Sequence, residues 1–214
     1  MMSILLHRRT MKPRFRLPMS AEQAYDCLLA AVMAEVAFRH RSFYETKDTK
    51  SQLRQMANWI TSDSSKFGIL LCGACGNGKS TLLKAFQQLL NFLSIPYPDG
   101  QGNYGIHITD SKSVAYLGKT DYKAFIQLSQ KKMPGIDDLG SEPREVMDFG
   151  NVVTPVIDLL TMRYDEQLFT IITTNLTPKQ IREHYGDRIA DRLNEIVEKI
   201  VFKNNSFRTD NSLT

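Results

Sequence analysis

Apolar residues recur at helical intervals over the first sixty residues of the chain. Between residues 24 and 38 they follow the three- and four-residue steps of one helix face, and Ser20 with Gln23 makes the capping-box pattern that precedes a helix. Residues 50–60 repeat these steps. The polar residues 61–66 then interrupt the pattern. The pattern therefore predicts two helices in this part of the chain.

From residue 67 onward, short apolar runs alternate with helical stretches. The predicted strands lie at residues 67–73, 104–109, 135–140, 168–175 and 198–204. The predicted helices lie at residues 79–95, 111–117, 121–130, 151–164, 177–186 and 187–196. Runs that are apolar throughout are typical of parallel strands buried on both faces. The alternation predicts a three-layer α/β fold, in which helices cover both faces of a parallel sheet.

These patterns divide the chain into three parts. A basic arm occupies residues 1–19, a short helical segment residues 20–65, and the α/β domain residues 66–214. The arm carries five lysines and arginines and no acid. Such an arm can touch nucleic acid or an acidic protein face, or it can be a solvated tail.

Composition narrows the class of protein. Hydrophobic residues make up 42% of the chain and charged residues 23%, which is the balance of a soluble globular protein. No apolar run approaches the ~20 residues of a membrane span, and the N-terminal run Ile4–Leu6 is too short for a secretory signal. Three cysteines give no disulfide framework. We therefore expect a cytoplasmic protein that does not enter a membrane.

Two motifs overlap at residues 72–80. Cys72 and Cys75 have the C-x-x-C spacing of a redox dithiol or half a zinc site, whereas residues 73–80 read G-x-x-x-x-G-K-S, the phosphate-binding loop of nucleotide hydrolases. A zinc site needs a second ligand pair, but only Cys27 and four scattered histidines remain. A phosphate loop needs a buried strand before it and a helix that starts within it, and the flanking segments supply both. The sequence therefore predicts a site for a nucleotide and Mg²⁺, formed by Gly73, Gly76, Asn77, Gly78, Lys79, Ser80 and Thr81.

Further polar residues follow two of the predicted strands. Asp137 and Asp138 lie in "GIDDLGSEP", where one carboxylate can hold Mg²⁺ and the other can polarise an attacking water. The alternative is a surface turn, because Pro134 and Gly135 weaken the strand before the two acids. Asn175 ends the next predicted strand. It can bond a γ-phosphate or the water, or it can cap the helix that follows.

Four segments together resemble the AAA+ ATPases of the DnaC/DnaI helicase-loader group, whose clan also contains the transposon helper ATPase IstB. They are "GACGNGKST", "GIDDLGSEP", "TIITTNL" and "YGDRIADRL", and the resemblance covers residues 66–209. It implies an AAA+ domain that binds ATP and Mg²⁺ and hydrolyses ATP. Many AAA+ proteins have Asp-Glu where this chain has Asp-Asp, which suggests slow turnover. We also expect no separate C-terminal lid.

The resemblance implies roles for the residues around the nucleotide. Lys79 and Ser80 would act on phosphate and Mg²⁺. Asp137 would be the metal-side acid, Asp138 the catalytic carboxylate, and Asn175 the sensor 1 residue. Arg208 would be the sensor 2 arginine.

The resemblance also implies an arginine finger in "DRIADRL", with Arg192 as the first choice and Arg188 as the second. A finger completes the ATP site of a neighbouring subunit, so the chain would form an ATP-dependent homo-oligomer. The alternative is that both arginines pair along a solvated helix with the acids around them, which are Asp187, Asp191 and Glu195.

The implied partner is a replicative DNA helicase that the chain loads or remodels on single-stranded DNA. In the IstB-like alternative the partner is a transposase on duplex DNA. Lysines and tyrosines that could bind single-stranded DNA cluster at Lys112, Tyr116, Lys119, Tyr122 and Lys123, although the tyrosines could instead pack inward. A small-molecule P-loop kinase and a non-catalytic, ATP-gated binding module are further alternatives.

Overall fold

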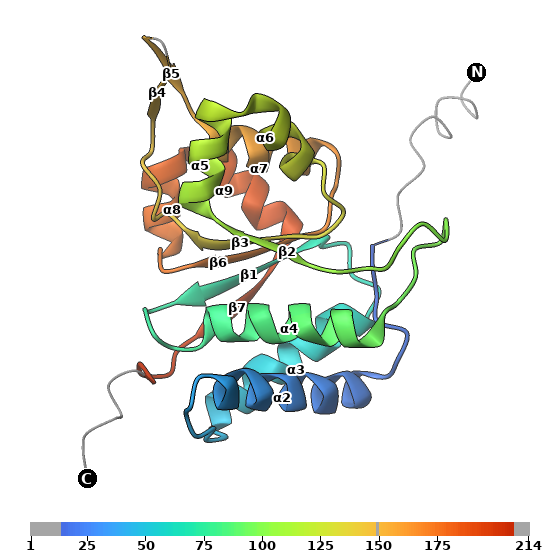
Figure 1. Cartoon of the computed structure of the whole chain (residues 1–214). Coiled ribbons are helices and arrows are strands. Elements are labelled where there is room, and N and C mark those ends of the chain that lie inside the picture. Colours follow the sequence, from blue (N-terminus) through green and yellow to red (C-terminus); the bar gives the residue numbers. More distant parts are fainter. Residues whose placement is uncertain (1–13, 149, 208–214) are drawn as a thin grey trace.

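The computed structural model of the chain describes residues 14–148 and 150–207. Its centre is a five-stranded parallel sheet with the strand order β2-β3-β6-β1-β7 (Figure 1). The strands are β1 (Gly68–Gly73), β2 (His107–Asp110), β3 (Pro134–Leu139), β6 (Thr170–Thr174) and β7 (Val197–Phe202). The parallel α/β sheet predicted from the sequence is confirmed.

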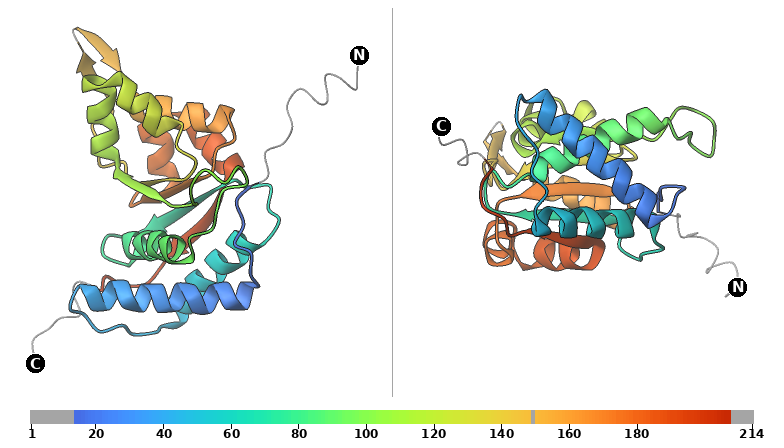
Figure 2. Two further views of the ribbon diagram at one scale, coloured as in Figure 1. Left: turned by 45° about the vertical axis from the view of Figure 1, so that its right-hand side comes forward. Right: turned by 90° about the horizontal axis from the view of Figure 1, so that it is seen from below.

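Helices cover both faces of the sheet (Figures 1 and 2). One face carries α2 (Ala21–Phe38), α3 (Lys47–Thr61) and α4 (Lys79–Leu93). The other carries α5 (Ser111–Thr120), α6 (Tyr122–Ser129), α7 (Pro155–Asp165), α8 (Pro178–Tyr185) and α9 (Asp187–Ile196). Among the residues described, no helix combines the length and the hydropathy that a membrane crossing requires.

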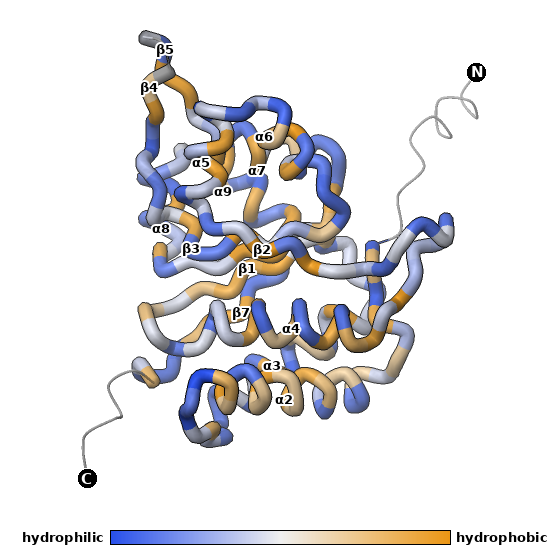
Figure 3. Tube along the Cα trace, viewed as in Figure 1, coloured by the Kyte–Doolittle hydropathy of each residue, from blue (hydrophilic) through white to orange (hydrophobic). Residues whose placement is uncertain are grey.

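An apolar core lies on each face of the sheet. Along β1, Ile69 and Leu71 join the core beneath α2, α3 and α4, whereas Leu70 joins the core beneath the other helices. Ile171 and Ile172 of β6 divide in the same way. Successive side chains of a strand point to opposite faces, so a strand that is apolar throughout fills both cores. The apolar run of β1 is visible in Figure 3.

The two N-terminal helices belong to the first of these cores. Leu28 of α2 and Trp59 of α3 are buried in one cluster with Phe86 of α4. The capping box predicted for α2 is present, since Ser20 Oγ accepts from the Gln23 N–H and Gln23 Oε1 accepts from the Ser20 N–H. The helical segment is therefore packed onto the α/β sheet as part of its outer layer.

The last residues of the basic arm also lie against the protein. Phe15 and Leu17 are buried in the first core. The Arg14 guanidinium stacks over the Trp59 ring at 4.3 Å and donates to the Trp59 carbonyl oxygen at 2.7 Å. Burial, and then the neighbouring Arg16, lowers the pKa of Arg14 to about 10. This part of the arm is not a solvated tail, and residues 1–13 lie outside the described residues.

The segment between β3 and α7 corrects one prediction. The sequence predicts a single helix over residues 151–164, but β5 (Asn151–Val153) pairs there with β4 (Val146–Asp148) in an antiparallel hairpin, and α7 begins only at Pro155. Thr154 precedes a proline, which disfavours the helical conformation at that residue, and proline itself suits the first position of a helix. The hairpin projects from the molecule beside α5 (Figure 1).

Candidate nucleotide-binding site

The phosphate loop joins β1 to α4, and its glycines meet steric demands that other residues would not. Gly76 has a φ of 81° and Gly78 a φ of 100°, in the left-handed region that favours glycine. A Cβ atom on Gly73 would lie 2.3 Å from the carbonyl oxygen of Phe202. Since α4 begins at Lys79, the free N–H groups of its first turn lie at the loop. The loop has the strand–glycine–helix context that the sequence predicts.

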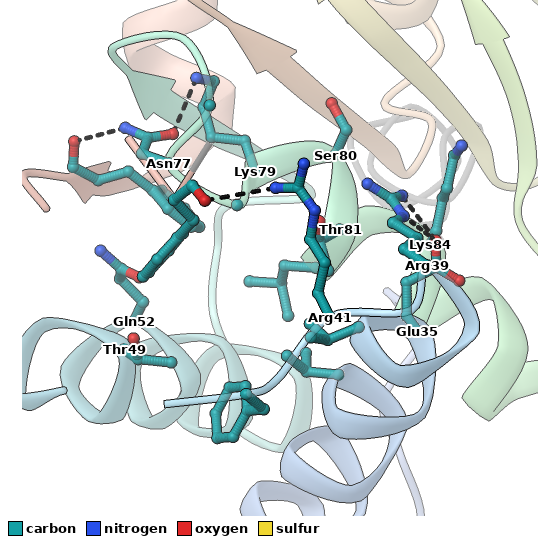
Figure 4. A pocket seen from close by; sticks show the side chains of 18 of the residues that line it. Glu35, Arg39, Arg41, Thr49, Gln52, Asn77, Lys79, Ser80, Thr81 and Lys84 are labelled. Carbon is teal, nitrogen blue, oxygen red and sulfur yellow. Dashed lines mark hydrogen bonds and ion pairs between the residues drawn. The ribbon is translucent and has the colours of Figure 1, made fainter. Parts of the chain in front are cut away.

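The Lys79 side chain is folded back into this loop (Figure 4). Its Nζ donates to the carbonyl oxygens of Gly73 and Ala74 at 2.8 and 2.7 Å, to Asn77 Oδ1 at 3.1 Å and to Asn175 Oδ1 at 2.8 Å. The residue is only 5% exposed, and burial lowers the pKa of Lys79 below its usual value. One buried cation therefore lies where such loops bind phosphate.

Asp137 is tied both to the phosphate loop and to the neighbouring strand. Ser80 Oγ donates to Asp137 Oδ1 at 2.8 Å, and Thr173 Oγ1 donates to the same oxygen at 2.5 Å. Carboxylate oxygens are preferred Mg²⁺ ligands, and the Ser hydroxyl of a phosphate loop reaches Mg²⁺ as well. Ser80 and Asp137, the two metal ligands expected from the sequence, are thus in direct contact and fit this ion.

Asp138 lies in a bulge at the end of β3. The pairing of β3 with β6 changes register between residues 136 and 139, so Asp137 and Asp138 both fall within the irregular part. Asp138 has a φ of 59°, which is uncommon for a residue other than glycine, and its N–H donates to Thr173 Oγ1 at 2.9 Å. Its carboxylate accepts from Asn175 Nδ2 at 2.8 Å. Both acids therefore lie beside the phosphate loop, at the pocket that it lines.

Pro134 and Gly135 do not interrupt β3. Pro134 is the first residue of the strand, where a missing N–H is tolerated. A Cβ atom on Gly135 would come within 3.0 Å of Leu83 and of Ile106. Glycine therefore allows α4 to pack closely on β3. The irregularity of this strand lies at the two acids and not before them.

A third acid near the motif, Glu142, is bound elsewhere. Its Oε2 accepts from the Gly140 N–H at 2.9 Å, and its Oε1 accepts from the Tyr185 hydroxyl. Burial, and then the Glu142 carboxylate, raises the pKa of Tyr185. Glu142 is buried and links the end of β3 to α8, so it does not reach the nucleotide pocket.

A pocket of about 880 Å³ opens beside the phosphate loop. One wall is the loop with Asp137, Asp138 and Asn175. The other consists of the end of α2, the connector 39–44 and α3, to which Glu35, Arg41 and Thr49 belong (Figure 4). Arg41 joins this second wall to the C-terminal segment, because its Nη1 donates to the carbonyl oxygen of Phe207 at 3.3 Å. The sequence prediction missed this second wall. The sequence feature that could have indicated it is "FRHRSFY", a basic and aromatic run between the two predicted N-terminal helices.

No protein-family model matches the sequence, and no curated protein gives a significant match. Several solved structures do match. The DnaC helicase loader has 21% identity and a TM-score of 0.56, covering 75% of this chain and 93% of that one. DnaI has 19% identity and a TM-score of 0.58, covering 91% and 96%. DnaA from Aquifex aeolicus, bound to AMPPCP, has 15% identity and a TM-score of 0.52, over 78% of this chain and 50% of that one.

The chain has the AAA+ fold of the DnaC and DnaI helicase loaders. Within this AAA+ fold, the two finger candidates lie in different surroundings. Arg192 packs its guanidinium over the Tyr164 ring at 4.6 Å and lies 3.5 Å from Asp165, and its side chain is 16% exposed. Arg188, in the first turn of α9, is exposed, and its side chain has no hydrogen bond or ion pair with any described residue.

The acids around the finger candidates bind other groups. Asp187 and Asp191 both pair with Arg182 of α8, at 2.5 and 2.6 Å. Glu195 accepts from the Tyr164 hydroxyl at 2.7 Å. The pairing along one solvated helix that the sequence left open is therefore not what α9 forms.

The α5–α6 surface, defined here as Lys112, Tyr116, Lys119, Tyr122 and Lys123, is exposed throughout. Tyr116 is 66% exposed and Tyr122 is 69% exposed, so neither tyrosine packs inward. Lys112, Tyr116 and Lys119 follow helical steps of four and three residues, which places them on one side of α5.

The two cysteines of the C-x-x-C motif lie in different surroundings. Cys72 lies in β1, whereas Cys75 is exposed in the phosphate loop. Burial raises the pKa of the Cys72 thiol. A protonated, strand-bound thiol is a poor nucleophile. Thr81 lines the pocket one residue after Ser80. Arg208 lies outside the described residues.

Proposed function

We propose that the chain binds ATP with Mg²⁺ and hydrolyses it slowly as an AAA+ ATPase. The supporting observation is that groups from three segments meet beside the phosphate loop. Three hydrogen bonds of 2.8 Å join Lys79 to Asn175, Asn175 to Asp138, and Ser80 to Asp137. A cation, a metal site and a second carboxylate at one point are the parts that phosphoryl transfer requires.

Each residue has a defined task in this proposal. Lys79 exchanges the loop oxygens for phosphate oxygens, with which it forms stronger, charge-assisted bonds. Ser80 and Asp137 would hold Mg²⁺, which neutralises negative charge on the phosphates. Asp138 orients the attacking water and accepts its proton, and Asn175 contacts the γ-phosphate or that water. The base and ribose occupy the side of the pocket formed by α2 and α3.

The finger is assigned to a second copy of the chain. Arg188 is the better candidate of the two, because it is exposed and unpaired among the described residues, whereas Arg192 is stacked on Tyr164. An exposed arginine can reach the γ-phosphate of a neighbouring subunit without breaking an internal contact. Hydrolysis therefore depends on an ATP-dependent homo-oligomer.

The cellular role we propose is the loading or remodelling of a replicative DNA helicase on single-stranded DNA in the cytoplasm. The α5–α6 surface supports this role, because its lysines can bind phosphates and its exposed tyrosines can stack on bases. Stimulation of hydrolysis by single-stranded DNA is the expected result. Stimulation by duplex DNA alone would favour the transposase-helper alternative.

Calorimetric titration with Mg²⁺–ATP tests the nucleotide site. Lys79→Ala should weaken binding about 100-fold, since it removes charged hydrogen bonds to phosphate. Lys203→Ala is the matched control, because it removes an exposed lysine that does not line the pocket. Absence of binding by the unaltered chain, or equal binding by Lys79→Ala, would contradict the proposal.

A further inference from the structure

A chain of side-chain amides runs from α3 to the phosphate loop. Gln52 Nε2 donates to Asn204 Oδ1 at 2.8 Å, and Asn204 Nδ2 donates to the carbonyl oxygen of Asn77 at 2.9 Å. Asn77 Nδ2 in turn donates to the carbonyl oxygen of Phe202 at 2.9 Å, and Asn77 Oδ1 accepts from Lys79 Nζ at 3.1 Å. Gln52 is 4% exposed and Asn77 is fully buried.

Hydrogen-bonding chemistry fixes the direction of this chain. The carbonyl oxygen of Asn77 can only accept, so Asn204 must present its NH₂ to it and its oxygen to Gln52. Asn77 is constrained in the same way, because the carbonyl oxygen of Phe202 only accepts and the Lys79 ammonium only donates. Asn204 and Asn77 therefore each have one amide orientation that satisfies both neighbours.

We propose that Gln52 is a positioning residue for the phosphate loop, which couples the N-terminal helices to the nucleotide site through Asn204. Asn77 is held by its backbone through Asn204 and by its side chain through Phe202 and Lys79. A shift of α3 away from β7 removes the Gln52 donor and leaves the partly buried Asn204 Oδ1 without it. The loop then loses one of the contacts that fix Asn77, which lies between two of its glycines.

Coupling of this kind acts in both directions. If the position of α3 changes nucleotide affinity, nucleotide binding must change the docking of α3 by the same free energy. A protein that binds the outer surfaces of α2 and α3 would therefore alter ATP affinity without touching the nucleotide. The inference rests on the proposed ATP site and names a residue outside its motifs.

The test compares the binding of Mg²⁺–ATP and of inorganic tripolyphosphate to the full chain. Gln52→Met, which keeps the size of the side chain, should lower the affinity for both ligands about tenfold. Asn204→Ala should lower both affinities by a similar factor. The double variant should bind each ligand about as well as the single variant with the lower affinity, because both substitutions break the same chain of bonds. Gln55→Met is the control, since Gln55 is exposed on α3 and bonds to Ser51 of that helix.

The outcomes separate this inference from its alternatives. A loss for ATP but not for tripolyphosphate would mean that Gln52 contacts the base, and the inference would be wrong. A lower melting temperature with unchanged affinity would also overturn it, because that is the result of a structural role. If Gln52→Met does not fold, Asn204→Ala decides by the same two criteria. Failure of the unaltered chain to bind ATP would count against the proposed function, whereas equal binding by all variants counts against the coupling alone.

Discussion

The phosphate loop and the α8–α9 pair both carry cations to which the proposed mechanism gives a role, but they hold them in opposite ways. Lys79 is buried and bonded to four oxygens of its own chain. Arg188 is exposed and bonded to no described residue. The first cation is positioned by one chain. In the proposal, the second acts on the ATP site of another copy of the chain.

The neighbours of Arg188 explain why it is left unpaired. Arg182 binds both Asp187 and Asp191, and so takes the two acids that flank Arg188 in sequence. Arg192 uses Tyr164 and Asp165 of α7. Arg182 therefore links α8 to α9 and Arg192 links α9 to α7, whereas the Arg188 side chain pairs with no described residue.

Replacing Arg188 should produce the largest effect. An arginine finger that stabilises transition-state charge is worth about 10³ in rate or more, so Arg188→Ala should lower assembly-stimulated hydrolysis by that factor. ATP binding should stay unchanged, because the side chain does not line its own pocket. Steady-state phosphate release and calorimetric binding, measured on the same preparation, check both parts. Full activity in this variant would show that Arg188 is not an arginine finger, and the proposed difference between the two regions would be wrong.

Asp138→Asn should have the next largest effect. It removes the carboxylate that accepts the proton of the attacking water, which costs roughly 10²-fold or more in turnover. The variant should still bind Mg²⁺–ATP, since Ser80 and Asp137 are intact. Single-turnover hydrolysis with labelled ATP measures this directly. If the variant hydrolyses ATP at the rate of the unaltered chain, Asp138 is not the catalytic carboxylate.

Arg192→Ala should affect stability more than catalysis. The change removes a cation–π contact at 4.6 Å and the burial of a side chain that is 16% exposed, which together are worth about 1–2 kcal/mol. Chemical denaturation should show this loss in the free energy of unfolding, with hydrolysis per folded molecule nearly unchanged. Should turnover fall about 10³-fold instead, with stability unaltered, Arg192 would be the finger.

The two regions also differ in how well the sequence predicts them. The backbone of the phosphate loop follows from local rules: glycine where φ is positive, a helix beginning at Lys79, and apolar residues in β1. The same holds for the cap of α8, where Thr177 and Gln180 form a capping box, so that Asn175 does not cap this helix and bonds Lys79 and Asp138 instead. Local patterns of this kind are present in the sequence itself.

Other features depend on contacts between distant segments. The bulge at Asp138 arises from the pairing of β3 with β6, and the wall formed by Arg41 arises from the packing of α2 and α3. The partners of Arg182 and Arg192 are likewise set by how α7, α8 and α9 pack. The β4–β5 hairpin was missed for a different reason: an apolar run before Pro155 was assigned to the helix that follows it.

Mixing two inactive variants tests the central claim most directly, namely that one ATP site is built from two copies of the chain. Asp138→Asn lacks the carboxylate and Arg188→Ala lacks the finger, so each alone should be nearly inactive under assembly conditions. In a mixture, some interfaces join an intact Asp138 to an intact Arg188. Hydrolysis that rises above both single variants on mixing is the predicted result. A mixture no more active than its components, with assembly confirmed by light scattering, would contradict the account.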